Sequence, residues 1–269
     1  MSARLYVEDH RGRGPLLSAA PFQARRGPLP LLSDPMSLIP LLLLADSRLP
    51  AGTHAHSGGL EAAVAAGRVS DAESLHAFLL GRLTSVGLTA AAFAAATALE
   101  LSGGVVVGER GFQADEAAAL DAEFDARTPS PAQREVSRRL GRQLIRAVRA
   151  GWPGAVLDAV AGLHPQGPHQ PIAFGAAAAV AGLDAAGTAS AAALGSVCGP
   201  ANAATRLLGI DPDSVTAVLT SLASTVEHVA VAALKAARGP IEDLPAATAP
   251  LLDICAEHHL TWEVRLFAS

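Results

Sequence analysis

The sequence has few aromatic residues, two cysteines, a single lysine and no long apolar run. Aromatic residues make up 4% of the 269 residues, although hydrophobic residues make up 50%. Alanine accounts for much of this hydrophobic fraction. Because alanine has the highest helix propensity and strand-forming residues are scarce, the composition disfavours a β-sandwich or a barrel. The chain is long enough to bury a core in one large domain or two small ones.

The other shortages exclude several classes of site. Cys198 and Cys255 lie far apart in the sequence, which excludes a zinc ribbon or a C-x-x-C motif and favours a reducing compartment. The lysine, Lys235, does not follow the glycine pattern of a P-loop. No apolar run reaches the roughly 18–20 residues of a spanning helix. Four prolines and Asp34 interrupt the apolar segment nearest the N-terminus, so we expect no membrane and no secretory signal.

The formal net charge is −5, and it is unevenly distributed. Residues 1–35 carry five arginines against three acids, a balance of +2, which leaves −7 for the remainder. This balance does not favour nucleic acid as a partner. Because residues 1–35 are rich in Gly, Pro and Arg and show no period, we expect a flexible extension followed by one domain at 36–269. Met36 is a second candidate for the start of translation.

From residue 36 onward, apolar residues recur at helical spacing between glycines and prolines. Helix starts are indicated by a capping box at Ser70–Glu73 and by a cap followed by proline at 130–131 and 211–212. These three helices are expected to end near residues 101, 151 and 239. Shorter helices are expected around 57–67, 114–126, 170–182, 187–208 and 246–257. We therefore predict an all-α fold, a single compact domain of about eight to ten helices.

The segment 185–204 consists mostly of Ala, Gly and Ser. Small side chains let helices approach closely. The segment therefore fits either a central helix packed tightly among its neighbours or a flat face for self-association.

The segment ADSRLPAGTHAHSGGLEAA, residues 45–63, combines turn residues with two histidines, His54 and His56. A histidine pair in a loop can ligate a metal, but a zinc or nickel site requires three or four donors. Asp46 and Glu61 are the nearest further candidates. The alternatives are a packed loop that is hydrogen-bonded through its histidines and a transient metal site.

The helix expected after Pro131 carries arginines on one arc and apolar residues on the opposite arc. The arginines are Arg134, Arg138, Arg142, Arg146 and Arg149. Such a row pairs with internal acids, binds an acidic protein surface, or contacts nucleic acid or anionic lipid. We single out Arg138 and Arg142 as candidates for an acidic partner surface.

The C-terminal segment HHLTWEVRLFAS alternates large apolar and charged residues, a pattern typical of extended chain. Trp262, Leu266 and Phe267 are apolar, and Glu263 and Arg265 are charged. Few soluble chains leave so much aromatic area on a free end. Either this tail packs back on its own domain or it inserts into a partner.

No catalytic motif is found: there is no Gly-x-Ser-x-Gly elbow, no His-Glu-x-x-His and no dinucleotide turn. Isolated His76 and His228 are expected to be core or boundary residues, and Cys198 and Cys255 are expected to be small buried hydrophobic residues. The tail and the arginine row favour a binding protein without catalytic residues. The alternative is a metal-dependent hydrolase that uses His54 and His56.

Four segments, in order, resemble the urease accessory protein UreF family, over about residues 37–269. They are LLLLADSRLPAGTHAHSGGLEAAVAAGRV, REVSRRLGRQLIRA, QPIAFGAAAAVAGL and the terminal EVRLFAS. Each match is weak alone, but four in this order are specific. The Ala- and Arg-rich character resembles actinobacterial members most.

The resemblance implies an all-helical, non-enzymatic and cytoplasmic assembly factor for the nickel enzyme urease. It implies a homodimer that binds the accessory protein UreH (also called UreD), recruits the GTPase UreG and helps to regulate it, and acts as a chaperone for apo-urease. No cofactor would be bound tightly, and nickel would be handled in transit. By position, Arg265, Leu266 and Phe267 would belong to the segment that docks on UreH. We expect Trp262 and Glu263 of the same tail to contact this partner as well. His54, His56, Ser57 and Glu61 would lie near partner or nickel-transit surfaces.

Overall fold

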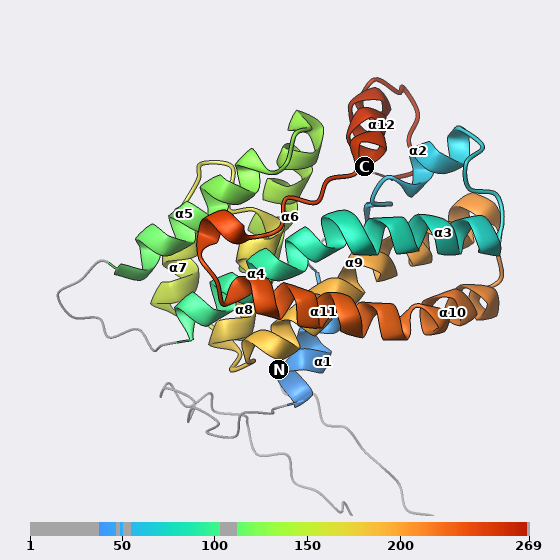
Figure 1. Ribbon diagram of the computed structural model, residues 1–269. Helices are drawn as coiled ribbons and strands as arrows, with labels where there is room; N and C mark the ends of the chain where they lie inside the picture. The colour runs from blue at the N-terminus through green and yellow to red at the C-terminus, as the bar shows by residue number, and fades with distance from the viewer. Residues whose placement is uncertain (1–37, 47–48, 51–54, 103–111, 268–269) are drawn as a thin grey trace, which may run out of the picture. The chain divides into compact units, whose positions relative to one another are not determined.

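The computed structural model describes residues 38–46, 49–50, 55–102 and 112–267, and this part of the chain is all-α and contains no strand (Figure 1). The expected all-α fold is confirmed, with more helices than the eight to ten expected. The flexible extension expected at residues 1–35 lies outside the described residues. The helices are α1 (Leu38–Ala45), α2 (Leu60–Ala65), α3 (Ala72–Arg82), η2 (Leu83–Gly87), α4 (Leu88–Leu101), α5 (Phe112–Ala126), α6 (Pro131–Arg149), α7 (Ala155–Ala161), α8 (Gln170–Val180), α9 (Ala185–Leu208), α10 (Pro212–Ser221), α11 (Ala223–Ala237), η3 (Ile241–Asp243) and α12 (Pro250–Leu260).

Helix α4 forms the centre of the core and packs against α8, α9 and α11 (Figure 1). Residues 91–98 of α4 are all buried, so the helix is enclosed on every side. Six of these eight residues are alanine, whose small side chain allows the neighbouring helices to approach closely. At Gly175 of α8, an added Cβ would lie 2.4 Å from the carbonyl oxygen of Ala94. The alanine-rich composition therefore serves close helix packing.

Helix α9 contains the small-residue segment 185–204 and contacts α2, α3, α4, α8 and α11. The prediction of a central helix packed among its neighbours is confirmed. The alternative use of this segment, a self-association face, stays a prediction.

The helix expected over 70–101 is helical without interruption from Ala72 to Leu101, but η2 within it is a π-helical turn. The hydroxyl groups of Thr84 and Ser85 donate to the carbonyls of Leu80 and Gly81, one turn earlier (2.9 and 2.6 Å). The predicted capping box was displaced by one residue. Asp71 is the N-cap, and its carboxylate and the Ser74 side chain exchange hydrogen bonds with each other's backbone N–H.

The stretch from Ala72 to Leu101 is also long and apolar enough to cross a membrane, by length and composition alone, and a second candidate arises if α10 and α11 count as one bent span. Helix α4, the C-terminal half of this stretch, is enclosed by other helices of the same chain. Burial in the protein core therefore accounts for its apolar sequence.

The helix expected from residue 212 to about 239 is instead two helices, α10 and α11, which meet at an angle of 47°. The sequence around the bend contains no proline or glycine, and the Ser221 hydroxyl donates to the Val218 carbonyl there at 2.7 Å. Leu222 at the bend is buried, α10 packs on α3 and α9, and α11 packs on α4 and α9. The bend therefore lies where the packing partner changes from α3 to α4.

Helix α12 begins at Pro250, four residues later than expected, and is bound to the start of α6. The Ser130 hydroxyl accepts from the Gln133 backbone N–H, which confirms Ser130 as the cap of α6. The Glu257 carboxylate of α12 accepts from that same hydroxyl and from the Ala132 backbone N–H (2.9 Å). These hydrogen bonds lower the pKa of Glu257. They fix the helix from which the C-terminal tail emerges.

Candidate partner-binding site

The C-terminal tail, residues 261–267, folds back on α2 and is held there by the carboxylate of Glu61. One oxygen, Oε1, accepts the backbone N–H of Leu266 at 2.7 Å. The other, Oε2, accepts the backbone N–H of Phe267 and contacts Nε2 of His259, each at 3.0 Å. Both Glu61 and His259 are buried. Hydrogen bonds to a charged group in a dry site are strong, so Glu61 acts as a clamp on the tail.

The sequence before α2 places this carboxylate. Gly58 and Gly59 both have positive φ, which glycine adopts without strain, and they lead the chain into the helix. The hydroxyl of Ser57 then accepts the backbone N–H of Glu61 at 3.2 Å. Ser57 and Glu61, singled out from the sequence as partner-binding candidates, are thus brought together with Leu266 and Phe267. Both are buried, which corrects their expected place on a partner surface, because their side chains hold the chain's own backbone.

The last turn of α12 supports the tail from its other end. Trp262 follows this turn, and its ring lies 4.7 Å from the His259 ring, centroid to centroid. Its indole N–H donates to Nδ1 of His258 at 3.2 Å. Trp262 is consequently half-buried, and it covers the histidine that contacts Glu61.

The tail is exposed over residues 263–266 and buried at Phe267. Phe267 is 6% exposed, whereas Val264 is 82% and Leu266 is 71% exposed. Glu263 and Arg265 are exposed as well. Leu260, at the end of α12, adds a further exposed apolar side chain. The tail thus packs back through Phe267 but leaves Leu260, Val264 and Leu266, named here the tail strip, open to solvent.

Replacing Glu61 by glutamine is expected to loosen the tail. A neutral amide offers one acceptor oxygen in place of two, so one of the two backbone N–H groups loses its partner. Hydrogen exchange should show at least about tenfold faster exchange of the Leu266 and Phe267 amides. Glu73→Gln, an exposed change on α3, is the control. Unchanged protection of these two amides would show that the clamp does not hold the tail.

The arginine row on α6 is paired mainly with acids of the same chain. Arg138 is buried, and its guanidinium contacts Asp121 at 2.9 Å and Asp125 at 2.6 Å. Arg134 lies 3.6 Å from Asp125, and Arg149 lies 2.5 Å from Asp158. The burial of Arg138 corrects its expected place on an acidic partner surface, because its guanidinium faces α5 and the loop before α8.

Two members of the row remain exposed, Arg142 and Arg146. The Arg142 guanidinium donates to the Gln166 carbonyl while the residue stays exposed. A role of Arg142 toward an acidic partner stays a prediction.

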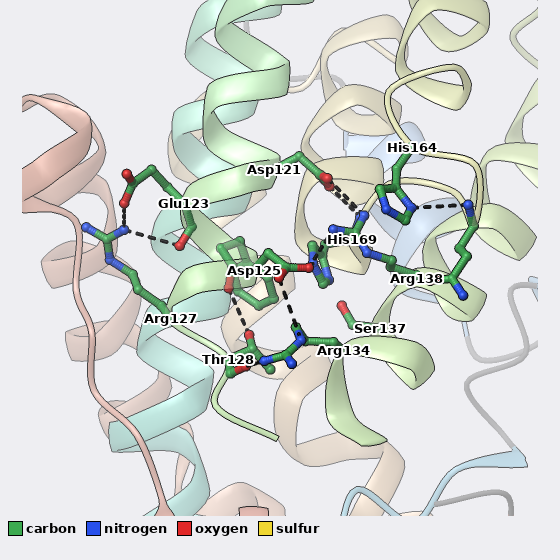
Figure 2. A network of polar contacts seen from close by, with 12 residues as sticks. Asp121, Glu123, Asp125, Arg127, Thr128, Arg134, Ser137, Arg138, His164 and His169 are labelled. Carbon is green, nitrogen blue, oxygen red and sulfur yellow. Dashed lines mark hydrogen bonds and ion pairs between the residues drawn. The ribbon is translucent and has the colours of Figure 1, made fainter. Parts of the chain in front are cut away.

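His169, which the sequence analysis did not identify, completes the group around Arg138 (Figure 2). Its backbone N–H donates to Asp121 at 2.7 Å, and its Nε2 lies 3.0 Å from Asp125. Burial lowers the pKa of His169 despite the nearby carboxylates. Burial opposes ionisation of Asp125, but hydrogen bonds from Arg138 and His169 outweigh it and lower the pKa of Asp125. The group joins α5, α6 and the start of α8.

A signal for this group was present in the sequence. Asp121 and Asp125 are four residues apart on α5, as are Arg134 and Arg138 on α6. Spacing of i, i+4 places the two acids on one face of α5 and the two arginines on one face of α6. The packing of the two helices then brings these faces together.

The loop that carries the histidine pair gives no metal site among the described residues. His54 lies outside the described residues, and His56 is buried. No group of three or more His, Cys, Asp or Glu side chains arranged to hold a metal occurs in the part that the structure describes. The end of this loop is held by Arg82, whose guanidinium donates to the carbonyls of Gly58 and Ser196, each at 2.9 Å.

Arg82 lines a cavity of about 530 Å³ that both cysteines also border. Burial lowers the pKa of Arg82 to about 10, so it stays protonated at neutral pH. Burial raises the pKa of Cys198, which keeps this thiol protonated. Cys198 and Cys255 are free and half-buried. They are therefore less buried than the small buried hydrophobic residues that the sequence predicted.

The isolated histidines differ. His76 is half-buried, as expected for a boundary residue, whereas His228 is exposed and bonds through Nδ1 to the Ser224 carbonyl at 2.6 Å.

Comparison with known proteins shows which family this chain belongs to. The family model UreF matches residues 69–223. Urease accessory protein UreF of Mycobacterium sp. (strain JLS) is 43% identical over 233 residues, which cover 87% of this chain and 99% of that protein. The UreF proteins of Mycobacterium marinum and Mycobacterium tuberculosis H37Rv are 45% and 41% identical, over 87% and 83% of this chain and 99% and 94% of their own lengths. The chain therefore belongs to the urease accessory protein UreF family, a family of accessory proteins and not of enzymes.

Proposed function

We propose that the chain is a non-enzymatic scaffold that links the accessory protein UreH (UreD) to the GTPase UreG and assists nickel insertion into apo-urease. Family membership gives the coarser role, urease maturation, and excludes the alternative of a metal-dependent hydrolase. The observation that carries the finer proposal is the tail strip, which is exposed and yet anchored on both sides.

Anchoring matters because it reduces the entropy cost of docking. A free tail would lose conformational freedom on binding, whereas the Glu61 clamp and the buried Phe267 already fix residues 266 and 267. Each exposed apolar side chain then contributes on the order of 25 cal/mol per Å² of area that the partner covers. We therefore place the UreH contact on the tail strip.

The experiment replaces the two most exposed apolar residues of the tail, Val264 and Leu266, by aspartate. A charge buried against a partner without a counter-ion is costly, so tagged UreH co-expressed with V264D/L266D should capture less than about a tenth of the wild-type amount. Val231→Asp is the matched control, because Val231 is 69% exposed but lies on α11. Capture of the double variant at the wild-type level would refute the proposed docking site.

Surface substitution tests this better than deletion of Trp262–Ser269. Deletion removes the buried Phe267 and leaves the Glu61 carboxylate without the two backbone N–H groups that it accepts. A buried carboxylate deprived of partners destabilises the fold, so lost capture would have two explanations. The helical circular dichroism of V264D/L266D should instead match the wild type.

The remaining parts of the proposal concern assembly and cargo. We propose a cytoplasmic homodimer, with UreG regulated through surfaces other than the tail strip. Nickel is cargo handled by the complex in transit, without a tightly bound cofactor in this chain. Contact of His54 and His56 with nickel stays a prediction.

A further inference from the structure

A hollow of about 590 Å³ opens beside the tail, and three arginines from three different segments line it. Arg139 comes from α6, Arg206 from the last turn of α9, and Arg265 from the tail. Phe267 and Leu266 border the same hollow, as does Leu260. Segments far apart in the sequence thus bring three positive charges together next to the tail strip.

These arginines differ from those of the α6 row. Arg134, Arg138 and Arg149 are each paired with an aspartate of the same chain. The guanidinium groups of Arg139, Arg206 and Arg265 make no hydrogen bond or ion pair with any described residue. The lining contains one acid, Glu135, so three positive charges against one negative charge leave a balance of +2. The hollow is therefore complementary to an anionic group.

The surroundings favour an acidic polypeptide over a small anion. Leu260 and Leu266 are exposed at the same hollow, and Val264 is exposed nearby in the chain. A free phosphate would neutralise the arginines but would leave these apolar side chains in water. A polypeptide segment with carboxylates beside apolar residues would pair with the arginines and also cover the apolar side chains. Guanidinium groups bind carboxylates in a bidentate geometry.

We propose that this hollow, named here the arginine hollow, receives an acidic segment of the protein that covers the tail strip. The inference rests on the proposed function for the identity of that protein, UreH. The arginines provide charge complementarity, which sets association rate, register and salt dependence, and the tail strip provides apolar burial. Two neighbouring surfaces of different chemistry thus recognise one partner.

The first arm of the test needs no partner protein. Fluorescein-labelled hexaglutamate is titrated into the wild type, into Arg139→Glu/Arg206→Glu and into the control Arg146→Glu at low salt. Arg146 is exposed on the same helix but does not line the hollow. We expect saturable binding to the wild type and the control, and at least about tenfold weaker binding to the double variant. Equal binding to all three proteins, or no binding to any, overturns the proposal.

The second arm measures the affinity of the same three proteins for purified UreH at low and high salt. The double variant should bind at least about tenfold more weakly at low salt and lose most of the salt dependence. If the double variant no longer binds hexaglutamate but binds UreH as tightly as the wild type does, the arginine hollow does not contact the protein that covers the tail strip, and the proposal is overturned. If the wild type binds inorganic phosphate but not hexaglutamate, the hollow is a small-anion site, and the proposal of an acidic segment is overturned. If the wild type binds hexaglutamate but not UreH, the proposed function fails, while the hollow is supported as an acidic-peptide site.

Discussion

Replacing Arg138 by alanine is expected to lower the free energy of unfolding by about 3–5 kcal/mol. The guanidinium is buried, and it contacts Asp121, Asp125 and the Gly167 carbonyl. Removing it leaves the Asp121 carboxylate, which is also buried, without a counter-charge. An uncompensated buried charge costs far more than the loss of a surface ion pair, which is worth at most about 1 kcal/mol.

Urea unfolding followed by helical circular dichroism, at one fixed protein concentration, measures this effect. Arg146→Ala on the exposed side of the same helix should change stability by no more than about 0.5 kcal/mol. Arg138→Lys keeps the charge but not the forked geometry, so it should fall between the wild type and Arg138→Ala. A loss below about 1 kcal/mol for Arg138→Ala would contradict the structural role assigned to this arginine.

The arginine row shows what a sequence pattern can and cannot decide. The spacing of Arg134, Arg138 and Arg142 predicted one face of a helix, and α6 places them so. The pattern does not show which part of the face is covered. That depends on α5 and on the loop before α8, whose positions follow from tertiary packing. Arg138 therefore forms a buried ion pair with Asp121, while Arg142 stays exposed.

The tail shows the same limit at smaller scale. Alternation in the C-terminal segment predicted an extended chain, but the structure does not separate apolar from charged residues there, since residues 263–266 are all exposed. It buries Phe267 and exposes Val264 and Leu266, because the backbone register is set by the Glu61 carboxylate. Glu61 lies about two hundred positions earlier in the chain, so local spacing carries no information about this contact.

Helix caps and most helix ends were predicted well, whereas the bend between α10 and α11 was not. Ser130 and Asp211 cap helices through hydrogen bonds within a few residues, which the sequence displays. The bend at Leu222 lies where the packing partner changes from α3 to α4, and α12, which starts later than expected, packs against α6. Local chemistry fixes the first kind of feature, and long-range packing fixes the second.

Replacing Gly141 by alanine is expected to destabilise the protein by about 3 kcal/mol, at the upper end of the cost of overpacking. Gly141 lies within α6, where an added Cβ would be 2.0 Å from the carbonyl oxygen of Pro168 and 3.0 Å from the carbonyl carbon of His169. Backbone atoms cannot rotate away as a side chain can, so α6 and this loop must separate. Urea unfolding measures the loss, and Gly81→Ala is the matched control.

The control should change stability in the opposite direction. An added Cβ at Gly81 of α3 meets nothing within 4 Å, so alanine there should raise the free energy of unfolding by about 0.5–1 kcal/mol through helix propensity.

The cost at Gly141 should also be coupled to Arg138. The displaced loop carries the Gly167 carbonyl and the His169 N–H, which bind Arg138 and Asp121. The double variant Arg138→Ala/Gly141→Ala should therefore lose less stability than the sum of the losses in the two single variants. A loss equal to that sum would show that α6 meets the loop through two independent contacts.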